Sequence, residues 1–256
     1  MKKFSFTVDD NIRFFKEICE NGYDSIFNHP YLAMYKRLHN RFNLKVQLNL
    51  FYEMENFNLS MMTDSFREEW KDNSDWLKMS FHSKLENEFP YAYSEYDEVF
   101  NDCKAVNEQV VRFAGKASLG ETTTVHFCQT TKAGLQALKD NNIKALLGLF
   151  GDEEKPYTSY ALGSDTASLI RKGNIVESDG VSFGSLDIVL NCFDKETILG
   201  KLQNLLNRKN IQVMIHEQYF YPDYRAYQPE FEEKLFTTFE FLKENGFISS
   251  FFEEMI

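Results

Sequence analysis

The stretch Phe4-Ser5-Phe6-Thr7-Val8-Asp9-Asp10 decides the interpretation of this chain, because a run of alternating apolar residues ends there in two adjacent carboxylates. A segment with apolar residues at helical spacing follows at once, with Ile12, Phe15 and Ile18 on one side. In parallel α/β sheets and barrels, reactive groups collect where strands end and helices begin. The pair at positions 9 and 10 is therefore predicted to be catalytic or metal-binding.

The rest of the chain continues this alternation of strands and helices. Six further strands are predicted at 45–52, 76–81, 122–128, 144–150, 186–192 and 211–215. Helices are predicted after the first strand, from Pro30 onward, and at 64–72, 94–113, 131–141, 194–208 and 229–246. The strand at 45–52 places Gln47 and Asn49 on one side, which indicates a polar inward face. We therefore expect an α/β fold with parallel strands, in one domain spanning residues 1–256.

One stretch interrupts this rhythm. Residues 151–185 are rich in Gly, Ser and Asp and contain an Asp-Gly pair at 179–180 between two short apolar runs. Such a pair is a strong hairpin signal. We predict a small β-hairpin insertion at about 151–185, in which tyrosines such as Tyr160 pack the hairpin.

Composition narrows the class of protein. The chain has 256 residues, 43% of them hydrophobic, which is enough for one large core. A net charge of −11 without a basic cluster argues against nucleic acid as a partner. No stretch approaches the roughly 18 apolar residues of a membrane span. We therefore expect neither nucleic acid nor a membrane as partner, with homo-oligomerisation left open.

The cysteines and the first residues bear on location. Four widely spaced cysteines show no CxxC pair, which argues against a disulfide framework or a zinc ribbon. The basic start Met1-Lys2-Lys3 is not followed by an apolar segment, so no secretory signal is expected. Both observations predict a cytoplasmic protein.

Three of the five histidines share one predicted edge of the fold with the aspartate pair. His82 follows the third strand, His126 falls near the end of the fourth, and His216 ends the seventh. His29 and His39 are interpreted as surface or capping residues. The coincidence across several strands predicts a site assembled from distant parts of the chain.

Local spacing suggests a metal at that site. His82 and Glu86 are four residues apart, so both face the same way if the chain enters a helical turn there. With Asp10 they would form a mixed nitrogen and oxygen site for zinc or another divalent ion. The competing interpretations are an ordinary side-chain pair at positions 82 and 86 and a helix-capping role for Asp9 or Asp10.

These residues resemble a family. Residues 6–10 are similar to the first motif of the polysaccharide deacetylases, the nodulation-protein-B homology group, in which an apolar strand ends in Asp-Asp. His82-Ser83-Lys84-Leu85-Glu86 is similar to their His-Ser/Thr-x-x-His motif, and Val213-Met214-Ile215-His216 to their last motif. The resemblance implies a distorted parallel (β/α)7 barrel with surrounding helices, here with the hairpin insertion.

The resemblance also implies roles for single residues. Asp9 would be the general base, Asp10 and His82 metal ligands, and His216 the general acid of a deacetylase acting on an N- or O-acetylated carbohydrate or a small amide. The partner would be a small-molecule or oligosaccharide substrate, and the cofactor one divalent metal ion, with zinc favoured over manganese, iron or nickel.

The chain departs from the family's motifs at two places. Glu86 stands where the family has a second ligand histidine, and is expected to complete the metal site. The family's Arg-x-Pro segment is absent, and His126 occupies that stretch as an orienting group or a further ligand. Tyr219 and Tyr221, which follow His216, are expected to bind a sugar ring or to pack the core.

Two other functions remain open. A glycoside hydrolase on a related barrel would pair Asp9 with Glu53, Glu86 or Asp152. A non-catalytic carbohydrate-binding relative would keep the barrel and lose hydrolysis, and the missing second histidine supports it.

Overall fold

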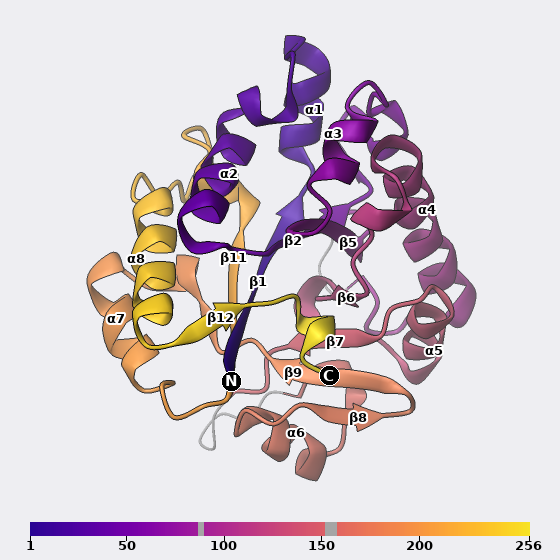
Figure 1. Ribbon diagram of the computed structural model, residues 1–256. Helices are drawn as coiled ribbons and strands as arrows, with labels where there is room; N and C mark the ends of the chain where they lie inside the picture. The colour runs from indigo at the N-terminus through magenta and orange to yellow at the C-terminus, as the bar shows by residue number, and fades with distance from the viewer. Residues whose placement is uncertain (87–89, 152–157) are drawn as a thin grey trace.

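The computed structural model describes residues 1–86, 90–151 and 158–256 and shows strands that form a distorted barrel with helices around it (Figure 1). The barrel strands are β1 (Lys2–Asn11), β2 (Val46–Phe51), β5 (Leu77–Ser83), β6 (Thr122–Thr123), β7 (Ala145–Gly148), β9 (Val181–Ser185), β10 (Ile188–Val189) and β11 (Asn210–His216). Four further short strands are β3 (Glu53–Met54), β4 (Phe57–Asn58), β8 (Val176–Ser178) and β12 (Phe247–Ser249). The helices are α1 (Arg13–Asn21), α2 (Pro30–Phe42), α3 (Arg67–Asp72), α4 (Tyr96–Ala114), α5 (Lys132–Asp140), α6 (Ser164–Arg171), α7 (Lys195–Gln203) and α8 (Phe231–Glu244).

The barrel wall consists of two parallel sheets. One has the strand order β10-β11-β1-β2-β5, and the other contains β6, β7 and β9 in that order. They meet at β5, where Met79 bridges Leu119 in parallel. On the far side, the Leu186 N–H donates to the Gly148 carbonyl at 2.8 Å. The expected parallel α/β barrel is confirmed.

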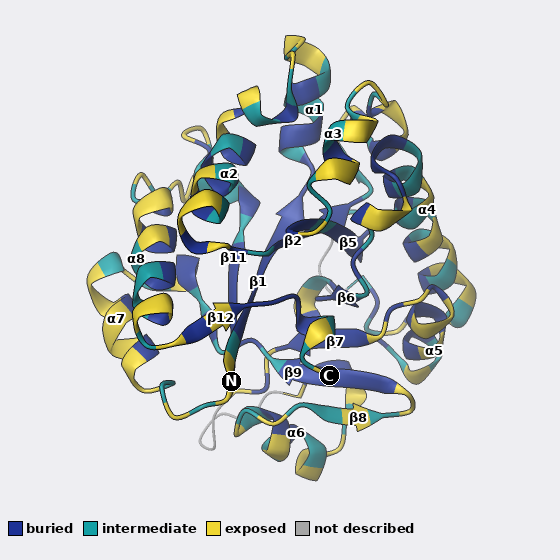
Figure 2. Cartoon of the chain, in the orientation of Figure 1, coloured by how far each residue is buried: buried dark blue, intermediate teal, exposed yellow. Residues whose placement is uncertain are grey.

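The alternation of β1 separates a helix-facing side from a barrel-facing side. Phe4 stacks on Phe239 of α8 with ring centroids 5.6 Å apart, and Phe6 lies 6.0 Å from Tyr35 of α2. Figure 2 shows the strands buried and the outer sides of the helices exposed. Burying each of these rings contributes on the order of 1.5–3 kcal/mol. The intervening polar side chains, which include Ser5 and Thr7, are therefore directed into the barrel, where they are 2% exposed.

The hairpin expected at 151–185 is present, but it is more than an addition to the barrel. β8 and β9 pair in antiparallel fashion around Asp179 and Gly180, both of which have positive φ, as the turn requires. β9 also pairs in parallel with β7, so it forms part of the barrel wall. Tyr160 packs on Phe183 at 5.9 Å, as predicted. Residues 152–157, and with them Asp152, lie outside the described part of the chain.

Several boundaries differ from the prediction. The strand expected at 122–128 ends at Thr123, and a short 3-10 turn at His126–Cys128 follows, with left-handed conformations at Phe127 and Cys128. The strand expected at 186–192 is reduced to Ile188–Val189. α6 and β12, each a short element, were not predicted. Among the described helices, none has the length and apolar character needed to cross a membrane.

Candidate metal and catalytic site

Two irregularities in the parallel sheet direct side chains into one cavity. Between β1 and β2 the register shifts so that Asp9 and Asp10 together oppose Asn49. Asp10 has a φ of 64°, and this left-handed bulge lets both aspartates line the cavity instead of facing opposite sides of the strand. Between β2 and β5 the register shifts again, and His82 is the extra residue.

Neither aspartate caps the helix that follows. Ile12 occupies the N-cap of α1 without a side-chain bond. The carboxylate of Glu217 caps this helix instead, accepting the N–H groups of Ile12 at 2.7 Å, Arg13 at 3.1 Å and Phe14 at 2.9 Å. Glu217 directly follows His216, so this cap ties the end of β11 to the end of β1.

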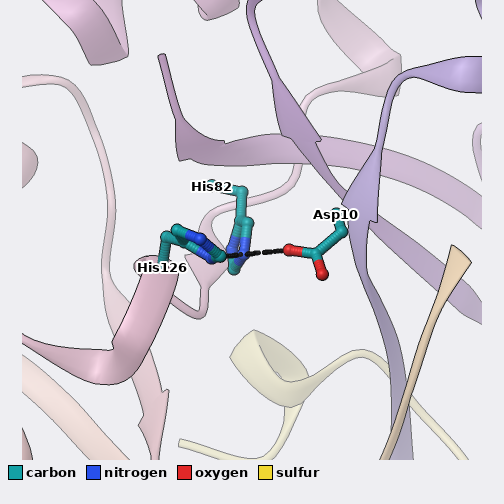
Figure 3. A group of neighbouring side chains, drawn as sticks. All are labelled: Asp10, His82 and His126. Atoms are coloured by element: carbon teal, nitrogen blue, oxygen red, sulfur yellow. Dashed lines mark hydrogen bonds and ion pairs between the residues drawn. The ribbon is translucent and has the colours of Figure 1, made fainter. Parts of the chain in front are cut away.

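Asp10, His82 and His126 converge on one point (Figure 3). His82 Nε2 lies 3.0 Å from Asp10 Oδ1 and 3.0 Å from His126 Nδ1, and His126 Nδ1 lies 3.4 Å from Asp10 Oδ1. All three potential ligand atoms lie within 4.8 Å of one another. Two imidazoles and a carboxylate are a common donor set for zinc and related divalent ions.

Hydrogen bonds around the three residues support a cation at this point. His82 Nδ1 lies 2.5 Å from the carbonyl of Thr124, which can only accept, so Nδ1 carries the proton. Nε2 then faces Asp10 Oδ1 and His126 Nδ1: in the protonated ring it donates to the carboxylate, and in the neutral ring its lone pair can bind a metal ion. A backbone carbonyl behind a histidine is the usual support of a metal ligand. Gln218 orients the carboxylate from the other side, donating to Asp10 Oδ2 at 2.7 Å.

The pKa shifts reflect the mutual attraction of these groups: although burial opposes the change, the charge of Asp9 and the hydrogen bond to Asp10 raise the pKa of His82. Burial would raise the pKa of Asp10, but the hydrogen bond from His82 and the charge of His216 outweigh it and hold the pKa below its usual range. Burial, reinforced by the charge of His82, lowers the pKa of His126 to about 3. His126 is thus neutral near pH 7, the form that binds a metal.

Asp9 and His216 stand next to this cluster on adjacent strands, directly opposite each other in the β1–β11 register. Burial raises the pKa of Asp9, against the opposing charges of His82 and His216. A carboxylate with a raised pKa is a stronger base than an ordinary one. His216 is partly exposed and lines the cavity. The two predicted catalytic residues are therefore placed together.

The cavity has a volume of about 690 Å³. Its described lining includes all five residues of the predicted catalytic and metal groups, which are Asp9, Asp10, His82, Glu86 and His216, together with His126, Phe127, Leu149, Val189, Met214, Gln218, Tyr219 and Arg225. Tyr219 thus lies where a substrate would bind. Tyr221 does not: it is 4% exposed, and its hydroxyl donates to Glu217 at 2.9 Å, so it packs beneath α1.

Glu86 differs from its expected role as third ligand. It lines the cavity, but the group that converges within 4.8 Å contains His126 instead. The physical reason is local: residues 84–86 form a bend after β5, not the helical turn that would bring positions 82 and 86 to the same side. Burial raises the pKa of Glu86, and the charge of Arg225 opposes that rise.

Other residues around the site were not singled out from the sequence. Asn49 donates to Asp9 at 2.7 Å, and Asn191 accepts from His216. The polar inward face of β2 was a signal for Asn49, since Gln47 and Asn49 are 2% and 0% exposed. Asn191 and Gln218 lie in turns whose position no local pattern indicates.

Comparison with known proteins supports the fold. Neither a protein-family profile nor a curated protein sequence matches this chain. Solved structures do match across 99% of it. A family 4 acetyl xylan esterase from Clostridium thermocellum, in complex with a cobalt ion, has a TM-score of 0.55, 13% identity and 90% of its own chain covered.

Two further solved structures give the same result. A peptidoglycan N-acetylglucosamine deacetylase has a TM-score of 0.56, 14% identity and 87% of its chain covered. A CE4 family pseudoenzyme from Bacillus anthracis has a TM-score of 0.58 and 10% identity, and this chain spans 64% of its length. With its parallel barrel and surrounding helices, the chain has the fold of the CE4 polysaccharide deacetylases.

Proposed function

We propose that this protein is a metal-dependent deacetylase that hydrolyses an N- or O-acetylated carbohydrate or a small amide. One observation carries the proposal: Asp10, His82 and His126 converge as ligands beside Asp9 and His216. Neither a sugar-binding surface nor a barrel core needs this arrangement of buried ionisable groups.

In the proposed mechanism, Asp10, His82 and His126 hold one divalent ion, with zinc favoured and manganese, iron or nickel as alternatives. When bound, the ion would polarise the acyl carbonyl and lower the pKa of water. Asp9 takes the proton of the attacking water, and His216 gives a proton to the leaving nitrogen or oxygen. Each proton transfer would contribute on the order of 10² to 10⁴ in rate. The products are acetate and an amine or alcohol.

The substrate class rests on the cavity. Its volume of about 690 Å³ suits a molecule of one or a few sugar rings, and Tyr219 offers a stacking surface at the wall. The activities named for two structures of the same fold, an acetyl xylan esterase and an N-acetylglucosamine deacetylase, support an acetylated sugar. The four free cysteines fit a reducing compartment, so we also propose a cytoplasmic location.

The two alternatives have weaker support. For a glycoside hydrolase, Glu53 is not among the described residues lining the cavity, and Asp152 lies outside them, which leaves Glu86 as the partner of Asp9. A non-catalytic relative is a real alternative, because a pseudoenzyme has the same fold. It would bind ligand without releasing acetate.

Metal analysis combined with an acetate-release screen over acetylated sugars tests the proposal. We expect about one divalent ion per chain after loading with zinc, manganese or iron, and acetate release that a chelator abolishes. Asp9→Asn should abolish release while metal content stays near normal. An equal loss of metal would instead make Asp9 a ligand, and a protein that binds no metal after loading would exclude this function.

A further inference from the structure

Three polar side chains form a line across the barrel interior from β2 to the proposed base. Gln47 Nε2 donates to Asn49 Oδ1 at 2.9 Å, and Asn49 Nδ2 donates to Asp9 Oδ1 at 2.7 Å. The three residues are 2%, 0% and 1% exposed. Buried hydrogen bonds of this kind fix geometry more strongly than exposed ones.

One backbone carbonyl determines which atoms of Gln47 and Asn49 donate and which accept. Gln47 Nε2 also donates to the carbonyl of Thr122 at 2.7 Å, and a carbonyl can only accept. The amide nitrogen of Gln47 is therefore identified, and its second hydrogen is the one that Asn49 Oδ1 accepts. The nitrogen of Asn49 must then face Asp9. Gln47 thus donates both to the carbonyl in β6 and to Asn49, and Asn49 donates to the carboxylate of Asp9.

The space for Gln47 depends on a glycine in the neighbouring segment. A Cβ at Gly120 would lie 2.9 Å from Gln47 Oε1 and 3.3 Å from its Cδ. The barrel interior around this amide is therefore closely filled, and Gln47 has little freedom to turn. The position of the Asn49 amide is fixed in consequence.

The two oxygens of Asp9 have different surroundings. Oδ1 accepts from Asn49, whereas Oδ2 accepts no hydrogen bond from any residue in the described ranges 1–86, 90–151 and 158–256. Asp9 also forms no ion pair with a lysine or arginine of these ranges. One oxygen is thus held, and the other remains available to a water molecule in the cavity.

We propose that Asn49, held in place by Gln47, is a positioning residue that fixes Asp9 Oδ1 and so aims the other carboxylate oxygen at the attacking water. This inference rests on the proposed function, since it assigns how the proposed base is oriented. Displacing a reacting group by about 1 Å can cost on the order of 10²-fold in rate.

The experiment compares kcat, KM and metal content for Asn49→Asp, Asn49→Ala and Gln47→Glu. Asn49→Asp keeps the shape but replaces the donor by an acceptor, and Gln47→Glu removes the donor that orients Asn49. We expect kcat to fall on the order of 10²-fold for both Asn49 variants and less for Gln47→Glu. KM and metal content should change by about twofold at most.

Ser80→Ala is the matched control. Ser80 is also fully buried, and its hydroxyl has no hydrogen-bond partner among the described residues, so its loss should leave kcat unchanged. A normal kcat in both Asn49 variants would overturn the positioning role. A loss of metal, or a rise in KM, that by itself accounts for the lost activity would also overturn it.

A second measurement does not depend on activity. In NMR spectra, the side-chain amide resonances of Asn49 should shift on Asp9→Ala and not on Thr238→Val, a substitution at a buried position of α8. If they do not respond to Asp9→Ala, the inference is wrong even in an active enzyme. If they respond and the wild type releases no acetate, the contact stands, whereas the proposed function and the positioning role both fail.

Discussion

Asn191 Oδ1 accepts two hydrogen bonds from His216, one from Nδ1 at 2.9 Å and one from the backbone N–H at 3.2 Å. The backbone donor identifies the amide oxygen, so Nδ1 of the neutral ring must carry its proton. In the protonated ring Nε2 carries the second proton, which is the one available to a leaving group of the substrate. The structure thus fixes which ring atom would act as the proposed acid.

Replacing His216 should separate catalysis from metal binding. His216→Gln removes the proposed proton donor but no ligand of the converging group, so kcat should fall on the order of 10² to 10⁴-fold with metal content unchanged. Asn191→Ala should lower kcat less, because the imidazole remains and only its orientation is lost. Steady-state kinetics beside metal analysis measures both effects, and loss of metal in His216→Gln would place this residue among the ligands.

A second pair of variants decides the third ligand. Losing a residue that supports a metal ligand typically weakens metal binding by roughly 10- to 100-fold. His126→Ala removes a proposed ligand itself, so zinc or cobalt should bind more weakly by a larger factor than this. Glu86→Gln should change the affinity by about twofold at most. Calorimetric titration of the chelator-treated protein gives both values. The reverse order would restore Glu86 as the ligand predicted from the sequence.

The left-handed backbone at Asp10 predicts an order of stabilities. Alanine at a φ of 64° carries a steric cost of roughly 1–2 kcal/mol that glycine avoids. Asp10→Gly should therefore be more stable than Asp10→Ala by about 1 kcal/mol, although glycine gains entropy in the unfolded chain. Urea unfolding in the presence of a chelator measures this without a contribution from bound metal. Equal stability would mean that the bulge relaxes when the carboxylate is removed.

Glu217 predicts a pH dependence of stability. Burial raises its pKa to about 7 in the fold, above the ordinary value of 4.5, although three backbone N–H groups oppose the rise. The folded state therefore binds more protons than the unfolded state between these values, and the free energy of unfolding should fall as the pH rises from about 4.5 to 7.

Glu217→Gln supplies the control for that effect. The variant should lose the part of this slope that Glu217 contributes, while Asp187, whose pKa burial also raises to about 7, keeps its own part. The variant should also be less stable by about 1–3 kcal/mol, because its amide nitrogen would face backbone donors. Urea titrations at several pH values compare the two proteins. If the free energies of unfolding of the two proteins differ by the same amount at every pH from about 4.5 to 7, the pKa of Glu217 is not raised.

Much of the fold could be predicted from local patterns. The alternating run at residues 4–8 and the helical stripe at 94–113 correspond to β1 and α4. These patterns repeat over several turns or residue pairs, so tertiary contacts do not override them. Among the elements missed, α6 has 8 residues, β12 has 3, and β3 and β4 have 2 each, too few to show a period.

The site was only partly predictable, for a geometric reason. His216 ends its strand as expected, and the Asp-Asp pair faces the cavity. The membership of His126, however, depends on a turn with left-handed residues at 127 and 128, and sequence spacing alone does not give that conformation. The spacing of positions 82 and 86 and the motif in which they stand favour Glu86 as the ligand. The bend at 84–86 means that this closeness in sequence does not bring Glu86 into the converging group.

The two β-bulges make the number of residues in each strand as important to the site as their identities. Removing one residue between Val8 and Asn11, or the extra residue at position 82, would restore a regular pleat. The residues that follow the deletion in the strand would then point to the opposite side. A ligand side chain among them would face the helices, even though its identity is unchanged. The site should therefore tolerate conservative substitution far better than a deletion of one residue, since the deletion reverses the inside and outside of the barrel wall beyond it.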